Sequence, residues 1–459
     1  MAEPRYMDRL TAQDLFTLWT DDFGWSQDIG ALATLDGTRL LDGDGHIRID
    51  HIRRHIEPRL QLVPRFRQLL YRPRLGLGWP LWVDAQFFDL ADHVRVQPLA
   101  PPGDEAQLLQ ACAQLYQRRL DPTRPLWQLW LLPSLPDQQV GVFLRAHHTL
   151  ADGVAGVAVF GALLDLDADA PPPVPAPWTP APIPSAGALL GDNLRRRLRG
   201  LGRGLSRLGH ASRPREASQG ALREFFAERA PRTSLNRRIG SERRLAIVRS
   251  RLQVAKQDAH AHHAKVNDVV LAAVAGGLRQ LLAGRGEDID RLVLRVMVPI
   301  SLHHEQPGQA RGNQIGYMVV PLPLGEPNPV RRLELIAGET AARKQQARPQ
   351  SASGILSLPV VQRASYRFQP HQRFVNLSVT NVPGPPVPLY LAGAQLLELF
   401  PVAPILGNLT LTVGVLSYAG QLNLTAMADQ ATCPDVEVFA QGVRGALDEL
   451  ARSALVPAS

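Results

Sequence analysis

The sequence predicts an α/β protein in two lobes with mixed sheets. The chain has 459 residues, of which 45% are hydrophobic and 20% charged, and this length exceeds what one ordinary core contains. Segments that alternate like strands and segments with helical spacing occur in both halves, on either side of a proline- and alanine-rich stretch from 165 to 184. We therefore expect an N-terminal lobe over residues 1–185, a basic, Leu/Arg-rich linker over 186–240 and a C-terminal lobe over 241–459.

The N-terminal half begins with a short helix after residue 7, and the apolar residues 29–35 then predict a strand. A helix is expected from Ile47 to Leu70, interrupted near Pro58 and Pro64 because proline lacks the backbone N–H that a helix needs. The pattern further predicts a strand over 79–88, an amphipathic helix over 105–119, a strand within 121–133, a buried strand over 140–146 and a helix over 153–166.

The C-terminal half has the same mixture of elements. Asn267 precedes a strongly apolar run and is well placed as the N-cap of a helix. The expected order is a strand from 243, a helix up to 265, the apolar helix from 267, strands over 291–300 and 314–324, a helix over 330–346, a strand over 373–380, a hairpin of 409–418 with 421–427, and a final helix over 435–451.

Two adjacent histidines, His147 and His148, stand at the end of the buried strand over 140–146, and Asp152 and Gly153 follow them in the turn to the next helix. Strand side chains alternate between faces, so only one of the two histidines can face a given cavity, which argues against both binding one metal. One imidazole would act as an acid or base and the other would be packed.

The two residues that follow the histidines in this motif have structural readings. Asp152 stands in an apolar setting and would need a cationic or hydrogen-bonding partner, so we interpret it as an anchor. Gly153 fits a position where a side chain would block a positive φ or a close approach. Two hydrogen-bonded core histidines beside a capping aspartate remain the alternative reading of the whole stretch.

The pattern His-His-x-x-x-Asp-Gly after a buried strand resembles the signature of the CoA-dependent acyltransferase superfamily, which includes chloramphenicol acetyltransferase and peptide-synthetase condensation domains. The resemblance implies that the second histidine, His148, is the general base and that Asp152 is structural. It also implies two chloramphenicol-acetyltransferase-like lobes with a tunnel between them, into which His148 projects.

Further motifs narrow the resemblance to the bacterial wax ester synthase/diacylglycerol acyltransferases. Pro125-Leu126-Trp127 is similar to the PLW motif of that family, Asn267-Asp268 to its ND motif and Asn381-Val382-Pro383-Gly384-Pro385 to its NVPGP motif, and Gly312-Asn313 resembles its GN region. Their order matches over nearly the whole chain, from about residue 10 to 450. The chain departs from the family pattern at Gln27-Asp28, where a polar-aromatic or Met-His pair is usual, and at His303, where Arg is usual.

The resemblance implies transfer of a fatty acyl group from acyl-CoA to a fatty alcohol or to diacylglycerol, with acyl-CoA as co-substrate and no bound cofactor. Asn267, Ser378 and Thr380 are candidate oxyanion donors, although each also has a structural reading. Two rivals stay open: an acyltransferase of the same fold that uses an acyl-carrier protein or an amine, and a non-catalytic protein of lipid surfaces.

The net charge of +8 admits nucleic acid, anionic lipid or a polyanionic cofactor as a partner. We expect no nucleic acid, because no zinc finger, RNP-type motif or helix-turn-helix signal accompanies the excess of arginine between 195 and 244. Leucine and arginine alternate over 189–208 as in a basic amphipathic helix, which suits an anionic membrane or lipid-inclusion surface. A helix packed on the protein through its leucine face is the alternative.

Several features give expectations about metal, redox state and location. The histidine clusters at 260–263 and 303–304 lack a Cys or carboxylate at ligand spacing, so no metal is expected. Cys112 and Cys433 are interpreted as reduced structural thiols. The start has no signal-peptide pattern, and no apolar run reaches the roughly 20 residues of a spanning helix. We expect a cytoplasmic protein that associates peripherally with membranes or lipid inclusions.

Overall fold

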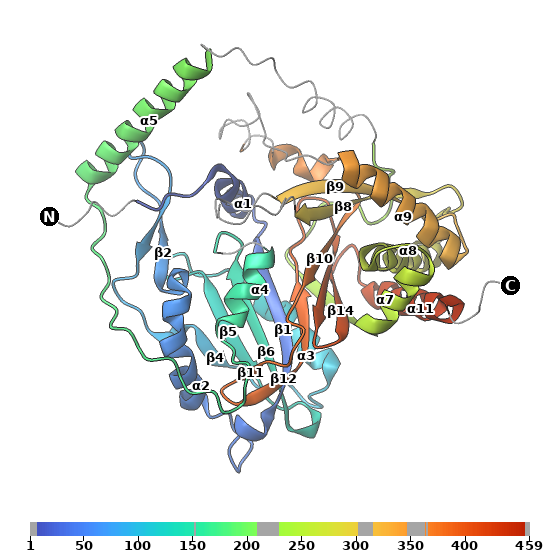
Figure 1. The fold of residues 1–459 in the computed structure, drawn as a ribbon, viewed down its shortest axis with the longest axis horizontal. Coiled ribbons are helices and arrows are strands. Elements are labelled where there is room, and N and C mark those ends of the chain that lie inside the picture. The colour runs from blue at the N-terminus through green and yellow to red at the C-terminus, as the bar shows by residue number, and fades with distance from the viewer. Residues whose placement is uncertain are drawn as a thin grey trace.

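Two six-stranded mixed sheets organise the computed structural model, which describes residues 7–150, 153–208, 229–301, 315–346, 363 and 366–454 (Figure 1). The first sheet contains, in spatial order, β11 (Tyr390–Leu391), β12 (Ala394–Val402), β1 (Asp28–Asp36), β6 (Gln139–His147), β5 (Trp127–Leu132) and β4 (Val94–Val96). The second contains β7 (Arg243–Arg251), β14 (Gln421–Asp429), β13 (Leu411–Tyr418), β10 (Leu377–Pro383), β8 (Val293–Ser301) and β9 (Ile315–Pro323). β4 and β5 are parallel, as are β8, β10 and β13, and the remaining neighbours are antiparallel.

Helices surround the sheets, and a small hairpin of β2 (Gln68–Tyr71) and β3 (Leu81–Asp84) stands apart from them. The helices of the first half are α1 (Ala12–Asp22), α2 (Ile49–Ile56), α3 (Glu105–Gln117), α4 (Gly153–Gly161) and α5 (Ala186–Leu208). Those of the second half are α7 (Leu252–Ala261), α8 (Val266–Gly284), α9 (Pro329–Gln346) and α11 (Val436–Ala454), and the 3₁₀ helix η7 spans Tyr366–His371. These bounds confirm the mixed α/β class.

Alternation along β6 divides the first lobe into two apolar cores. Leu144 and Ala146 belong to the core that includes Phe160 of α4, whereas Phe143 packs with the buried face of α3. The second lobe has one large core around α8, which packs against α11 and α9. α8 is long and apolar enough to cross a membrane, but 67% of its most apolar window is buried inside the fold, as expected for a core helix.

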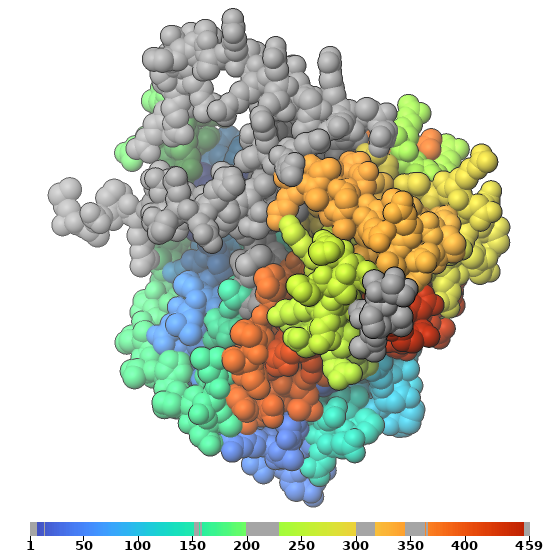
Figure 2. All heavy atoms as spheres, turned by 45° about the vertical axis from the view of Figure 1, so that its right-hand side comes forward, coloured from blue at the N-terminus to red at the C-terminus, as the bar shows by residue number. Residues whose placement is uncertain are grey.

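A segment of the C-terminal half belongs to the sheet of the first lobe, so the expected boundary at residue 241 does not separate the two sheets. β12 comes from the C-terminal half, yet it pairs with β1 of the first sheet. It also contacts β13 and β14, and the side-chain amide of Asn423 donates to the backbone oxygen of Leu399 over 3.0 Å. Figure 2 shows the resulting contact, with orange C-terminal residues bordered by blue and teal residues of the N-terminal half.

Several predicted elements required correction. The helix expected from Ile47 to Leu70 ends at Ile56 and continues as two 3₁₀ segments, Glu57–Leu62 and Pro64–Arg67, before β2, because each of these segments has proline in its first turn. The strand expected over 373–380 begins only at Leu377. The side-chain oxygen of Gln372 accepts the N–H groups of Phe374 and Val375 just before it, and that of Asn376 accepts the N–H of Arg295 in β8, so side chains replace the strand ladder there.

Candidate functional site

The two histidines lie where β6 ends, and both neighbouring segments hold their backbone. The N–H of His147 donates to the carbonyl oxygen of Leu126 over 2.9 Å, and the N–H of His148 donates to the carbonyl oxygen of Gln27 over 2.9 Å. One partner precedes β5 and the other precedes β1, so the turn is fixed from both sides of the strand. These two backbone hydrogen bonds hold the turn in one conformation, so a side chain on it has a defined direction.

His147 is buried and bonded through its side chain. Its Nδ1 lies 2.7 Å from Oγ1 of Thr149 and accepts from the backbone N–H of Thr149 over 3.3 Å. Because that N–H can only donate, the neutral ring carries its proton on Nε2. Nε2 lies 3.0 Å from Oδ2 of Asp21 at the end of α1, at ion-pair distance but outside hydrogen-bond alignment. This side chain is held between two partners.

His148 differs from its neighbour in position and burial. β6 ends at His147, so His148 is the first residue of the turn, and it is half-buried. The alternation of β6 places Phe143, Arg145 and His147 on one face, and continuing it assigns His148 to the opposite face, that of Ala146. α4 follows this turn and contacts β1 and β10. If this alternation continues into the turn, the side chain of His148 lies on the face of the sheet opposite to His147 and α1.

A buried ion pair supports the same end of the sheet, and sequence reasoning missed it. Arg145 and Asp28 have side chains that are 1% exposed, and Nη1 of Arg145 lies 3.7 Å from Oδ2 of Asp28. Burial raises the pKa of the Asp28 carboxyl, and Arg145 opposes that shift. Arg145 also donates to Oε1 of Gln128 over 2.9 Å and to the carbonyl of Tyr116 over 3.2 Å. Arg145 is a charged residue inside the apolar strand β6, and this could have indicated a buried partner of opposite charge.

The Pro125-Leu126-Trp127 motif acts through structure. Trp127 is fully buried, stacks on Phe66 at a centroid distance of 4.2 Å and donates from Nε1 to the carbonyl of Phe66 over 2.9 Å. It pairs with Ala146 across the β5–β6 ladder. The rigid packing of Trp127 therefore fixes the preceding carbonyl of Leu126, which receives the N–H of His147.

The Asn267-Asp268 motif lies at the start of α8, where the expected cap was wrong. The helix begins at Val266 with Lys265 as N-cap, so Asn267 is already inside the first turn. Asp268 supplies the capping contact: its carboxylate accepts the N–H of Lys265 over 2.9 Å and the hydroxyl of Thr340 over 2.7 Å. A carboxylate three residues into a helix can reach back to the cap in this way. Asp268 is buried and bonded by both neighbours.

The remaining candidates occupy β10 and the turn after His148. Leu377 and Val379 belong to the core of the second lobe, so alternation turns Ser378 and Thr380 to the opposite face of β10. Ser378 donates to the carbonyl of Met297 over 3.4 Å. Gly153 begins α4.

Other expectations fall partly outside the described residues. Asp152 lies there, as do His303, His304 and the Gly312-Asn313 pair. Within the described part of the chain, the cysteines at 112 and 433 are buried and free. The carboxylate of Asp21 was also missed by sequence reasoning, because nothing near it in the sequence links it to His147, which lies 126 positions later.

Comparison with known proteins adds to this geometry. Residues 10–270 match the model of the wax ester synthase/diacylglycerol acyltransferase catalytic domain, and residues 311–451 match that of the WS/DGAT C-terminal domain. The chain is 29% identical to a protein named probable diacylglycerol O-acyltransferase tgs1 of Mycobacterium tuberculosis, over 97% of this chain and 96% of that protein.

Two solved structures share the fold. The wax ester synthase/diacylglycerol acyltransferase of Marinobacter aquaeolei VT8 superposes with a TM-score of 0.71 at 22% identity, covering 98% of this chain and 100% of the other. The starter condensation domain of rhizomide synthetase, solved in complex with C8-CoA and Leu-SNAC, superposes with a TM-score of 0.58 at 16% identity and covers 98% of this chain and 94% of the other. These likenesses concern the two-lobed fold.

Proposed function

Because this chain belongs to the wax ester synthase/diacylglycerol acyltransferase family, we propose that it transfers a fatty acyl group from acyl-CoA to a fatty alcohol or to diacylglycerol, with His148 as the general base. Membership makes it an acyltransferase of this family. The observation that supports the assignment of the base is the contrast at the end of β6, where His147 is buried between Thr149 and Asp21 while His148 begins the turn half-buried.

The proposed reaction needs one movable proton and no covalent enzyme intermediate. His148 takes the proton of the acceptor hydroxyl while that oxygen attacks the carbonyl carbon of the thioester. The carbon–sulfur bond then breaks, and His148 returns the proton to the departing CoA thiolate. The imidazole is neutral again at the end of the cycle, and the products are the ester and free CoA, whose thiol carries the proton of the acceptor hydroxyl.

The remaining residues have supporting roles in this proposal. The carbonyls of Leu126 and Gln27 hold the backbone that carries the histidines. An oxyanion donor would stabilise the tetrahedral intermediate. Ser378 and Thr380 are retained as candidates because they lie on the face of β10 away from the second-lobe core, and Asn267 because its family motif is present.

The test is a direct assay of the whole protein. Palmitoyl-CoA with hexadecanol or diolein should yield free thiol and a matching neutral lipid in equal amounts. Turnover only with an acylated carrier protein or an amine acceptor would establish the first rival instead. Binding to lipid droplets without turnover of any acyl donor would establish the second rival, a non-catalytic surface protein.

We further propose that α5 attaches the enzyme to anionic membrane or lipid-inclusion surfaces, where its water-insoluble acceptors reside. The helix lies at the edge of the molecule in Figure 1. It is fixed to the protein through Leu189, which is 1% exposed, and through Asp192, whose carboxylate accepts from Arg9 over 2.6 Å. The side-chain amide of Asn193 also donates to the carbonyl of Gly76 over 2.8 Å.

The leucines on the other side of α5 support this proposal. Leu190, Leu194 and Leu198 repeat every four residues and are 54%, 56% and 59% exposed. Arg195 and Arg197 are exposed beside them. The alternative reading, in which the helix packs on the protein through its leucine face, is therefore wrong for these three residues. An outward apolar stripe flanked by arginine matches the interface of an anionic bilayer.

Liposome sedimentation tests the role of α5. Replacing Leu194 and Leu198 by Ser should lower the partition coefficient onto phosphatidylglycerol vesicles about tenfold, because apolar area no longer enters the interface. The matched control replaces Leu62 and Leu166 by Ser. These leucines lie outside α5 and are 60% and 75% exposed, and the control should sediment like the unmodified protein. If both double variants sediment equally, α5 does not attach the enzyme to the membrane and only connects the two lobes.

A further inference from the structure

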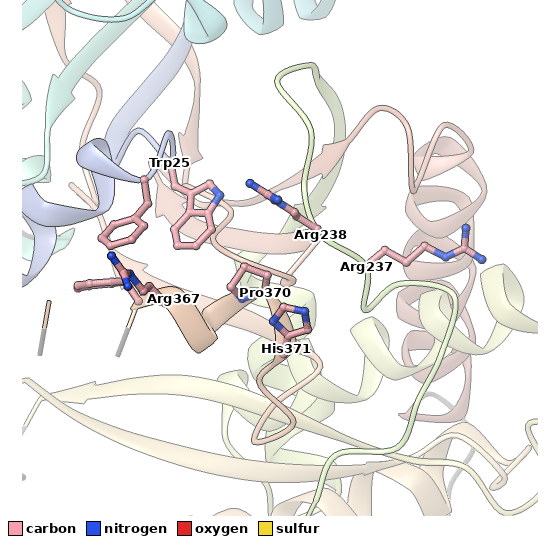
Figure 3. Close-up of a pocket in the computed structure, with 8 residues that line it drawn as sticks. Trp25, Arg237, Arg238, Arg367, Pro370 and His371 are labelled. Carbon is pink, nitrogen blue, oxygen red and sulfur yellow. The ribbon is translucent and has the colours of Figure 1, made fainter. Parts of the chain in front are cut away.

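An open hollow close to the histidine turn combines aromatic side chains with unpaired positive charge. It has a volume of about 530 Å³ and is lined by Phe23, Trp25, Arg237, Arg238, Tyr366, Arg367, Pro370 and His371. These residues come from the loop between α1 and β1, from the segment before β7 and from η7, so both lobes contribute (Figure 3). The lining contains no carboxylate.

The aromatic part of the hollow is packed and rigid. The rings of Phe23 and Trp25 stack at 5.9 Å, and Phe23 meets Tyr366 at 5.6 Å. The Tyr366 hydroxyl donates to the carbonyl of Phe16 over 2.5 Å and so ties η7 to α1. Trp25 and Tyr366 are buried, whereas Phe23 is half-buried. Phe23 is therefore the ring that offers accessible apolar surface to a flat group, and Trp25 and Tyr366 support it from behind.

The rim of the hollow is cationic. Arg237, Arg238 and Arg367 are exposed, and none of the three has an ion pair within the described residues. In Figure 3 the side chain of Arg238 extends toward Trp25, whereas that of Arg237 extends away. The nearby carboxylate of Asp22 is already matched by Arg363 at 3.0 Å and by Arg72 at 3.4 Å. The hollow therefore offers free guanidinium groups, which favour phosphate.

The hollow adjoins the histidine turn through one short segment of chain. Asp21 contacts His147, and the carbonyl of Gln27 receives the N–H of His148. Phe23 and Trp25 lie between these two residues in sequence, and two residues of chain span at most about 7 Å. A ligand in the hollow is thus within reach of the turn through a flexible arm.

We propose that this hollow binds the phosphorylated adenosine end of acyl-CoA, with Arg238 and Arg367 contacting the phosphates and the half-buried ring of Phe23 packing against the adenine. The choice of ligand rests on the proposed acyl-CoA activity. The chemistry selects a group that is flat, anionic and carried on a long arm: rings alone suit any apolar group, and arginines alone suit any anion, but the two together match a nucleotide phosphate. The pantetheine arm would then carry the thioester past the end of β6 to His148, whose side chain is assigned to the other face of the sheet.

Binding and kinetics test the proposal separately. The variant replaces Arg238 and Arg367 by Gln, which removes two positive charges and leaves the packed rings in place. The control replaces Arg48 and Arg54 by Gln in the loop before α2 and in α2 itself, where both arginines are also exposed but line a second hollow that contains Asp50. Both variants have the same net charge, so any difference between them belongs to the site and not to the overall field.

The first measurement is calorimetric binding of adenosine 3′,5′-bisphosphate and, separately, inorganic phosphate to the full-length protein. We expect the dissociation constant of the nucleotide to rise about tenfold in the Arg238→Gln/Arg367→Gln variant and to stay unchanged in the control. Inorganic phosphate should bind the unmodified protein more weakly than the nucleotide. Equal nucleotide affinity in both variants, or equal affinity for nucleotide and phosphate, would overturn the proposal.

The second measurement compares palmitoyl-CoA with S-palmitoyl pantetheine, which lacks the nucleotide. The preference for the CoA thioester, expressed as a ratio of kcat/KM values, should fall about tenfold in the variant and not in the control. An unchanged ratio with normal turnover would refute the nucleotide site while leaving the proposed function intact. If the unmodified protein transfers no acyl group but binds the nucleotide, and the variant does not bind it, the nucleotide site is supported and the proposed function is refuted.

Discussion

The end of β6 and the start of α8 both contain family motif residues, but their polar side chains are in different states. At the start of α8, Asp268 is buried and its carboxylate accepts hydrogen bonds from Lys265 and Thr340. At the end of β6, Nδ1 of the buried His147 is bonded to Thr149 and its Nε2 lies at ion-pair distance from Asp21, whereas His148 begins a turn and is half-buried. Motif membership alone therefore does not separate groups that stabilise the fold from groups placed to react.

The difference has a physical basis. A buried polar group with all its partners inside the protein contributes to stability, and moving it away from those partners is costly. A group that must exchange a proton with a substrate needs a side reachable by that substrate. The comparison is consistent with a stabilising role for Asp268 and His147; the chemical role of His148 is the proposal made above, and both can be tested by substitution.

Outside the histidine pair, the largest effect on stability is expected at the second-lobe motif. Asp268→Ala removes the capping carboxylate and leaves the N–H of Lys265 without its partner, which should lower the free energy of unfolding by about 2–4 kcal/mol. Thermal melting measures this, with Asn267→Ala as the neighbouring control. The remaining folded protein should still turn over acyl-CoA; a stable Asp268→Ala protein with no activity would reverse the assignment.

His55, a buried histidine elsewhere in the first lobe, shows how a histidine with a structural role depends on pH. The Nε2 of His55 donates to the carbonyl of Leu163 over 3.0 Å, and burial, followed by the charge of Arg59, lowers the pKa of His55 to about 4. Because the pKa in the fold lies below the unfolded value of 6.5, His55 favours the folded state fully above pH 6.5, and this contribution is lost as the pH falls toward 4.

Acid unfolding measures that contribution. Between pH 7 and pH 4 the unmodified protein should lose about 2–3 kcal/mol of folding free energy through His55, and His55→Gln should remove this part of the loss while its amide replaces the donor. Chemical denaturation at both pH values gives the numbers. An identical loss in the variant would assign the acid sensitivity to other groups.

The smallest effect is expected at the support of the histidine turn. Trp127→Phe keeps an aromatic ring against Phe66 but removes the Nε1 donor to the Phe66 carbonyl, at a cost of about 1 kcal/mol in unfolding free energy. Turnover should fall only slightly, because the backbone bond from His147 to Leu126 is retained. A loss of activity as large as that of a histidine variant would make Trp127 more than a packing residue.

The sequence predicted most of the fold because hydrophobic periodicity is local. The β-branched and aromatic residues over 140–146 predicted β6, and the apolar run after residue 267 predicted α8, within one or two residues. The sequence did not predict the pairing of β12 with β1, because register between segments more than 350 residues apart leaves no local pattern. Local spacing also misassigned the cap of α8, since Asp268 reaches back to Lys265 from inside the helix.

The candidate site was predictable only in part, for the same reason. The histidine pair is contiguous, so the alternation of side chains along a strand is enough to separate its two members. Its partners Asp21 and Gln27 are distant in sequence and were not expected, and the hollow beside them depends on three separate segments. Asp152 lies outside the described residues, and its role as an anchor stays a prediction.

The most direct test of the account measures thiol release from palmitoyl-CoA, together with a thermal melt, for His148→Ala and His147→Ala in parallel. His148→Ala should lose about 2 to 4 orders of magnitude in turnover with a nearly unchanged melting temperature. His147→Ala should instead lose about 1–3 kcal/mol of stability for each partner left unsatisfied. Full turnover by a well-folded His148→Ala protein would contradict the assignment of His148 as the base.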